Sequence, residues 1–303
     1  MNDTEQRIKE ALGLLAERTP HPGPTLNALK RKRKRQRNNV FLIATAGMAA
    51  VVVLIFAGVV ASNRYAPPNP NDAAAALVQG DGKGVPFKYA PHWLPDGFVE
   101  SLRATNMAPT RVWGPAGATP YSNPSVVIRA HGEMPDVRGW DPARVRGLEA
   151  WVQVRGDAAS VVWKAQDVLD VSVNGVADAR EVALRVAESV RADAKITHTP
   201  PFELEGRYAE LVRGTAPDSW HSSLAWNAVS VQVATAKPEL PAPNEPVTVR
   251  GKQGVRNGNT VAVQDGGLWI SATASAWSDE LVELVNKVEI VDRPDTGWIG
   301  KGI

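Results

Sequence analysis

An uncharged stretch of 22 residues, Val40–Ala61, constrains this chain more than any other part of its sequence. Thr45 is the only polar side chain in it. A helix of this length spans about 33 Å, which matches a hydrocarbon core of about 30 Å, and soluble core helices are rarely apolar on all faces. The stretch therefore predicts one transmembrane helix over residues 39–62.

A cleavable signal peptide is the alternative, because Val59–Ala61 resembles a small-residue cleavage site. The apolar region of a signal peptide usually has about 7–15 residues and begins near the N-terminus. Here the apolar region is longer and begins after 39 residues. The uncleaved anchor is the favoured interpretation.

A basic cluster stands just before the predicted span and sets its orientation. It consists of Lys30, Arg31, Lys32, Arg33, Lys34, Arg35 and Arg37. Basic residues remain cytoplasmic, so residues 1–38 are expected inside the cell and about 240 C-terminal residues outside. Each basic side chain gains about 1 kcal/mol near anionic headgroups. We expect the lipid bilayer as the partner of this cluster, and no nucleic acid.

The cytoplasmic segment 1–38 also carries a short amphipathic helix. Asp3–Gln6 has the spacing of a capping box, and Ile8, Leu12 and Leu15 follow at helical spacing. Isolated helices shorter than about 12–15 residues are marginal. Two interpretations remain: a weakly ordered tail, or a helix that docks on a cytoplasmic protein through Ile8, Leu12 and Leu15.

The residues beyond the span divide into a linker, 63–86, and two units, 87–196 and 197–303. The linker contains Pro67-Pro68-Asn69-Pro70 and an alanine run, which are typical of a spacer. In both units, segments rich in β-branched residues are followed by a helical pattern. The expected strands are 98–104, 125–130, 150–155, 160–165 and 168–173, then 208–213, 228–234, 247–250, 260–263 and 268–272.

Three sequence markers align the two units at a spacing of about 100 residues. Val145-Arg146-Gly147 recurs as Val249-Arg250-Gly251, and 169–173 recurs as 268–272. A helix is expected after Asp178 in the first unit and after Ser278 in the second, with these residues as N-caps. A duplicated unit of about 100 residues fits the usual domain size, although any two α+β domains look alike at this level. The fold class predicted is α+β, with one transmembrane helix and two tandem antiparallel sheet-plus-helix units.

The order of basic segment, single membrane helix and Pro/Ala-rich linker resembles bacterial anti-sigma-factor-like membrane proteins of high-GC, actinobacterial type. The outer units, with Val145-Arg146-Gly147, Val161-Val162-Trp163 and 169–173 before a helix, resemble envelope sensor and lipoprotein-carrier-like domains. This resemblance implies an extracytoplasmic domain coupled to a cytoplasmic partner such as a sigma factor. The zinc version of such proteins needs a CxxC pair, and this chain has no cysteine.

No catalytic or metal-binding motif occurs in the sequence. The five histidines, His21, His92, His131, His198 and His221, are scattered, and the pattern of carboxylates does not suit calcium. We therefore expect no catalytic, cofactor-binding or metal-binding residues. A hydrolase without a recognisable motif is the alternative.

All ten tryptophans follow the predicted span, since the first is Trp93. Tryptophan suits both protein cores and ligand clefts. One interpretation is that they pack between sheet and helix. The other is a groove for an envelope ligand in the second unit, lined by Trp220, Trp226, Trp269 and Trp277.

Together these features predict a non-catalytic, single-pass protein of a bacterial plasma membrane. Its preferred role is a regulator that couples the outer domain to a cytoplasmic partner. The alternative is an extracytoplasmic ligand-binding or structural module without signalling.

Overall fold

The computed structural model describes residues 84–240, 242–276, 278–292 and 294–303. All of them belong to one compact unit. The predicted span and the cytoplasmic segment lie outside the described residues. Within these four ranges, no helix has both the length and the apolar character needed to cross a membrane.

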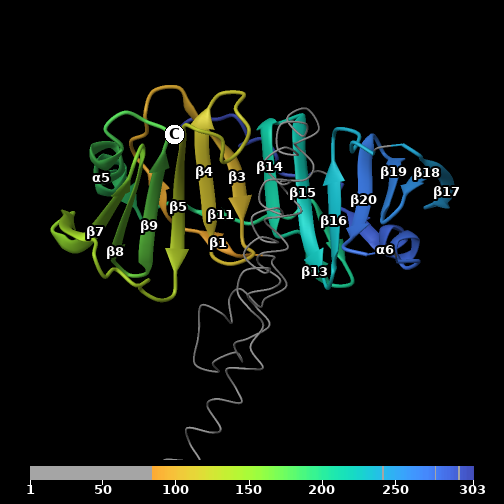
Figure 1. Cartoon of the computed structure of the whole chain (residues 1–303), viewed down its shortest axis with the longest axis horizontal. Helices are drawn as coiled ribbons and strands as arrows, with labels where there is room; N and C mark the ends of the chain where they lie inside the picture. The colour runs from red at the N-terminus through yellow and green to blue at the C-terminus, as the bar shows by residue number, and fades with distance from the viewer. Residues whose placement is uncertain (1–83, 241, 277, 293) are drawn as a thin grey trace, which may run out of the picture. The chain divides into compact units, whose positions relative to one another are not determined.

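Fourteen antiparallel strands form one continuous sheet (Figure 1). The strands of its first half are β3 (Phe98–Ala104), β4 (Thr110–Pro115), β5 (Ser125–His131), β6 (Asp141–Val145), β7 (Leu148–Arg155), β8 (Ala158–Lys164) and β9 (Val168–Asn174). The strands of its second half are β14 (Leu211–Ala216), β15 (Ser219–Trp226), β16 (Val229–Ala234), β17 (Glu245–Val249), β18 (Lys252–Asn257), β19 (Thr260–Asp265) and β20 (Leu268–Ala274).

The two halves have the same strand order, outward from the middle of the sheet. The first half runs β3-β4-β5-β9-β8-β7-β6, and the second runs β14-β15-β16-β20-β19-β18-β17. The corresponding strands β3 and β14 pair antiparallel, with Leu102 opposite Arg213 and Ala104 opposite Leu211. The sheets of the two predicted units are therefore a single sheet, which is joined through one strand of each half.

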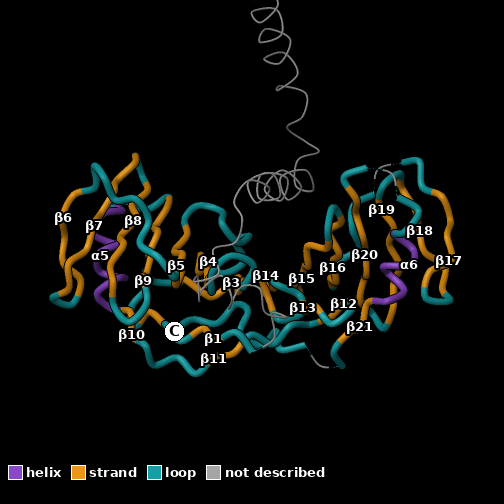
Figure 2. Tube along the Cα trace, turned by 90° about the horizontal axis from the view of Figure 1, so that it is seen from below, coloured by secondary structure: helices purple, strands orange, loops and turns teal. Residues whose placement is uncertain are grey.

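Each half packs one helix against its sheet. Helix α5 (Ala179–Ser189) contacts β8 and β9, and α6 (Leu281–Lys287) contacts β20 and β19. Figure 2 shows the helices near opposite ends of the strand order. Val161, Val171 and Val186 belong to the first core, and Ile270 and Val285 belong to the second. Burying each such side chain contributes about 1.5–3 kcal/mol.

Short strands link the helix ends to the rest of the unit. They are β1 (Pro86–Phe87) with β11 (Ile196–Thr197), β2 (Ala90–Pro91) with β10 (Val190–Arg191), and β12 (Phe202–Leu204) with β13 (Arg207–Tyr208) and β21 (Val288–Ile290). The strand that follows each helix thus pairs with a short strand that comes earlier in the sequence than the large-sheet strands of the same half. In the first half β10 pairs with β2, and in the second half β21 pairs with β12.

The two edges of the sheet have the same design. Edge strand β6 begins Asp141-Pro142, and edge strand β17 begins Glu245-Pro246. Proline has no N–H to donate to an added strand, and proline and charge on an edge discourage further pairing. Both edges therefore resist edge-to-edge association.

Several sequence expectations need correction. The described part is mostly β, with two short helices. The sheet is wider than the sequence predicted, because it also contains β4, β6, β15 and β18. The expected strand 208–213 is interrupted between β13 and β14. Asp178 precedes α5 in a left-handed conformation and makes no side-chain cap bond. Helix α6 begins after Glu280, and Ser278 Oγ instead accepts from the Glu280 N–H.

Candidate functional site

Two matching hairpin turns bring an arginine to the end of each helix. Arg146-Gly147 joins β6 to β7, and Arg250-Gly251 joins β17 to β18. All four residues have positive φ, at 52° and 80° in the first turn and 53° and 69° in the second, as a two-residue type I′ hairpin requires. An arginine in this conformation costs about 1–2 kcal/mol, so contacts elsewhere must hold it.

Those contacts come from the helix that each turn faces. The backbone N–H of Arg146 donates to Glu188, and that of Arg250 donates to Asn286, the next-to-last residue of each helix. Each guanidinium reaches the carbonyl of the valine after the helix, Val190 or Val288. The repeated Val-Arg-Gly marker is thus a connection between turn and helix in both halves.

In the second half ion pairs with Asp265 stabilise the connection between turn and helix. Arg250 Nε donates to Asp265 at 2.7 Å, and its Nη1 donates to Val288 O at 2.7 Å. Lys252 also binds Asp265. Hydrogen bonds from Lys252 and Arg250 hold the pKa of Asp265 below its usual value. The charges at this end of the second half are therefore paired.

In the first half the corresponding place is a half-open pocket of about 290 Å³. The residues that line it include the buried Trp163, Leu169 and Val190 and the more accessible Ala165 and Gln166. Leu148, which is 42% exposed, lies at its rim where the second half has Lys252. This volume is at the lower end of the range of small-molecule sites, about 300–1,000 Å³.

Two guanidinium groups converge beside this pocket. Arg191 Nη1 donates to Val190 O at 2.9 Å, and Arg146 Nη1 reaches the same oxygen at 3.4 Å. Among the described residues neither arginine forms an ion pair with a carboxylate. The second half has Glu289 directly after Val288. The first half is therefore cationic where the second is neutral or acidic.

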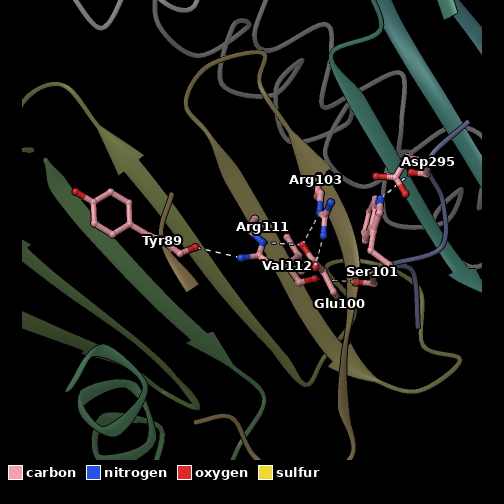
Figure 3. A network of polar contacts seen from close by, with 8 residues as sticks. Tyr89, Glu100, Ser101, Arg103, Arg111, Val112 and Asp295 are labelled. Carbon is pink, nitrogen blue, oxygen red and sulfur yellow. Dashed lines mark hydrogen bonds and ion pairs between the residues drawn. The ribbon is translucent and has the colours of Figure 1, made fainter. Parts of the chain in front are cut away.

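A second polar cluster lies at the middle of the sheet (Figure 3). The buried carboxylate of Glu100 accepts two hydrogen bonds from Arg103 and two from Arg111, at 2.7–2.9 Å. Burial alone raises the pKa of Glu100, but the bonds from Arg111 and Arg103 outweigh it and leave the pKa below its usual value. Arg111 also donates to Tyr89 O. Because its donors and acceptors are paired, this cluster is a structural connection.

The cluster also holds the C-terminal segment against the first half. Glu100 N–H donates to Lys301 O at 2.7 Å, and Gly300 N–H donates to Glu100 O at 2.8 Å. The Trp298 ring lies 4.2 Å from the guanidinium of Arg103. Residues from both halves therefore meet around strand β3.

The structure separates the predicted groove residues. Trp220 and Trp226 pack on the second core, on the face that bears α6. Trp269 lies on the opposite face, because the next residue, Ile270, points into that core. Trp277 lies outside the described residues, as do Ile8, Leu12, Leu15 and the basic cluster of residues 30–37. Trp269 therefore does not line one groove together with Trp220 and Trp226, whereas both N-terminal sites stay predictions.

The pocket residues were not expected from the sequence. A signal for them exists, since Asp141-Pro142-Ala143-Arg144-Val145-Arg146-Gly147 matches Glu245-Pro246-Val247-Thr248-Val249-Arg250-Gly251 at four positions and in its leading acid. The residue after each motif differs in character, Leu148 against Lys252. Within the described ranges, no group of three or more His, Asp or Glu residues is placed to hold a metal ion.

Comparisons with known proteins add little to these observations. No family model matches the chain, and no curated protein matches it. Among solved structures, a weak similarity is found to the crystal structure of MucB in complex with MucA(peri). It has 11% sequence identity, covers 64% of this chain and 94% of that chain, and has a TM-score of 0.17. A TM-score this low supports no argument about shared fold or function.

Proposed function

We propose that this protein is a non-catalytic, single-pass protein of a bacterial plasma membrane whose extracytoplasmic part binds a ligand. The N-terminus is cytoplasmic, and the described residues are extracytoplasmic. Support for this topology comes from the uncharged stretch Val40–Ala61 and the basic cluster before it.

The pocket of the first half is the observation that carries the binding function. Its lining includes the apolar residues Leu148 and Ala165 and also Arg146, whose guanidinium has no carboxylate partner among the described residues. An apolar concavity with a few convergent polar groups is the usual form of a ligand site. The second half has the same strands, yet its arginine is occupied by Asp265, so the fold itself does not require the open arrangement.

We further propose that ligand binding is coupled to a cytoplasmic protein through Ile8, Leu12 and Leu15, as in an anti-sigma-like regulator. The apolar stripe is the support for this role. Burying one such side chain contributes about 1.5–3 kcal/mol, so three of them suffice for micromolar docking after ordering costs. Binding without signalling is the second candidate, and the pocket favours it equally.

Capture of a cytoplasmic partner by the full chain in its native membrane separates these two candidates. Leu12→Asp places a charge in the stripe and should abolish capture, whereas Lys9→Asp changes a charge outside the stripe and should retain it. Membrane insertion should be unchanged in both variants, because the span is untouched. A partner that binds both variants equally, or no partner at all, contradicts the signalling role.

A further inference from the structure

We propose that the pocket beside Arg146 binds a carboxylate that ends a compact apolar group. This inference rests on the proposed ligand-binding function and adds the chemical class of the ligand. The two halves share a strand order but differ in the side chains around this turn. Where their folds agree, the differences between corresponding side chains indicate what only the first half does.

Two positively charged guanidiniums lie beside the pocket. Arg146 and Arg191 meet at Val190 O, and neither has a carboxylate partner among the described residues. Arg146 makes a single side-chain hydrogen bond, at 3.4 Å, although a guanidinium has five N–H donors. Its exposed guanidinium is therefore free to donate to an anion, and arginine suits the two oxygens of a carboxylate.

The second step concerns neighbouring acids, which could oppose an anion. Asp167 lies next to the pocket residue Gln166, but it accepts from Tyr89 Oη and pairs with Lys88. Glu188 is occupied by the backbone N–H of Arg146 at 2.8 Å. In the second half Asp265 already supplies a carboxylate to Arg250. The carboxylate of a ligand would thus give Arg146 the kind of partner that Asp265 gives Arg250 within the chain.

The third step concerns shape. Ala165 and Ala192 line the pocket with accessible apolar side chains, whereas the lining residues Trp163, Leu169 and Val190 are only 2–3% exposed. Leu148 adds an exposed apolar side chain at the rim. A volume of about 290 Å³ admits a group about as large as one or two apolar side chains. The ligand chemistry is therefore a carboxylate attached directly to a small apolar body.

Such a group occurs in two sources, a free carboxylic acid and the C-terminus of a peptide. The test uses the full chain in lipid nanodiscs and saturation-transfer NMR, with empty nanodiscs as the background. The probes are 4-phenylbutyrate for the free acid and N-acetyl-alanyl-phenylalanine for the peptide terminus. Each acid is compared with its neutral amide, and the acid that binds more tightly identifies the source.

We expect at least one acid to bind about tenfold or more tightly than its amide, as a charge-assisted hydrogen bond implies. Arg146→Gln should remove this preference. Arg144→Gln is the matched control, because it removes an exposed charge two residues away on edge strand β6. Leu148→Asp should abolish binding of the acid with little effect on folding, since Leu148 is exposed.

Several results would overturn the inference. Equal binding of acid and amide that is lost in Leu148→Asp leaves a ligand pocket but contradicts the carboxylate. An equal loss in Arg144→Gln and Arg146→Gln contradicts the role of Arg146. Failure of all four probes contradicts the ligand class, while the proposed membrane topology is tested separately by protease accessibility.

Discussion

Replacing Arg250 by alanine should destabilise the fold of residues 84–303 far more than the same change at Arg146. Arg250 makes two short hydrogen bonds, to Asp265 and to Val288 O, each at 2.7 Å. Longer bonds reach Val285 O at 3.3 Å and Asn286 O at 3.2 Å. Arg146 has one side-chain bond at 3.4 Å.

The magnitude follows from these contacts. A hydrogen bond to a charged group contributes about 1.5–3 kcal/mol, but the Arg250 and Asp265 side chains are 21% and 24% exposed. Solvent therefore reduces the contribution of each bond to the free energy of unfolding. In the variant, Asp265 also keeps Lys252 as a partner. We expect a loss of about 2–3 kcal/mol for Arg250→Ala and below about 1 kcal/mol for Arg146→Ala.

Urea unfolding of the full chain in nanodiscs, followed by tryptophan fluorescence, measures both losses. All ten tryptophans lie at Trp93 or beyond, so the signal reports on the folded part of the chain after residue 83. With a slope of about 2–3 kcal/mol per molar urea, Arg250→Ala should lower the midpoint by about 1 M. Asp265→Asn keeps the bonds to the helix carbonyls and should give an intermediate loss. Equal midpoints for Arg146→Ala and Arg250→Ala would refute the difference between the halves.

The buried Glu100 cluster, the buried His198 and the two cores can each be tested separately. Glu100→Gln leaves two buried guanidiniums without a carboxylate and should cost about 3–5 kcal/mol in urea unfolding, while the exposed-pair control Asp136→Asn should cost almost nothing; similar losses would contradict this account. Burial lowers the pKa of His198, and burial and Arg213 lower the pKa of His221 to about 3, so the unfolded chain binds more protons and the free energy of unfolding should fall as pH drops below about 6.5; His198→Gln should weaken this dependence without removing it, and an unchanged pH profile of the midpoint would argue against the contribution of His198. Residues 84–303 should unfold cooperatively without residues 1–83, because both cores lie within them; aggregation or a featureless near-ultraviolet tryptophan spectrum would place the boundary elsewhere.

The strands that the sequence predicts best are those with regular alternation over a buried face. The segment 168–173 matches β9 to within one residue, because Leu169, Val171 and Val173 alternate there with polar residues. The segment 98–104 coincides with β3 without such an alternation. Strand β15 contains Ser222 and Ser223, which are buried by pairing on both sides of the strand. Its polar sequence therefore resembles a loop.

The joining of the two halves could not be predicted from local sequence. It depends on the pairing of β3 with β14, residues more than 100 positions apart, and local patterns do not specify such a partner. The turn at Arg146 was also not predicted, because it too depends on contacts that are distant in the sequence. Asparagine or glycine usually marks a type I′ turn, and only the distant contacts with Glu188 and Val190 explain an arginine there.

The site was predictable only in part, because it is recognised by comparing Arg146 in the first half with Arg250 in the second. The Val-Arg-Gly repeat is visible in the sequence at residues 145–147 and 249–251. That one arginine is paired and the other is free depends on Asp265, which lies 15 residues along the chain from Arg250. The tryptophan groove was predicted from composition, which carries no information on which face of a strand each ring occupies.

Protease accessibility of the full chain in intact spheroplasts tests the proposed topology most directly. In the proposed topology residues 1–38 lie inside the cell and the pocket lies outside, because the basic cluster precedes the uncharged span. Added protease should remove an epitope at Ile303 and spare an epitope at Met1. Protection of the Ile303 epitope, or loss of the Met1 epitope from intact spheroplasts, would contradict the account.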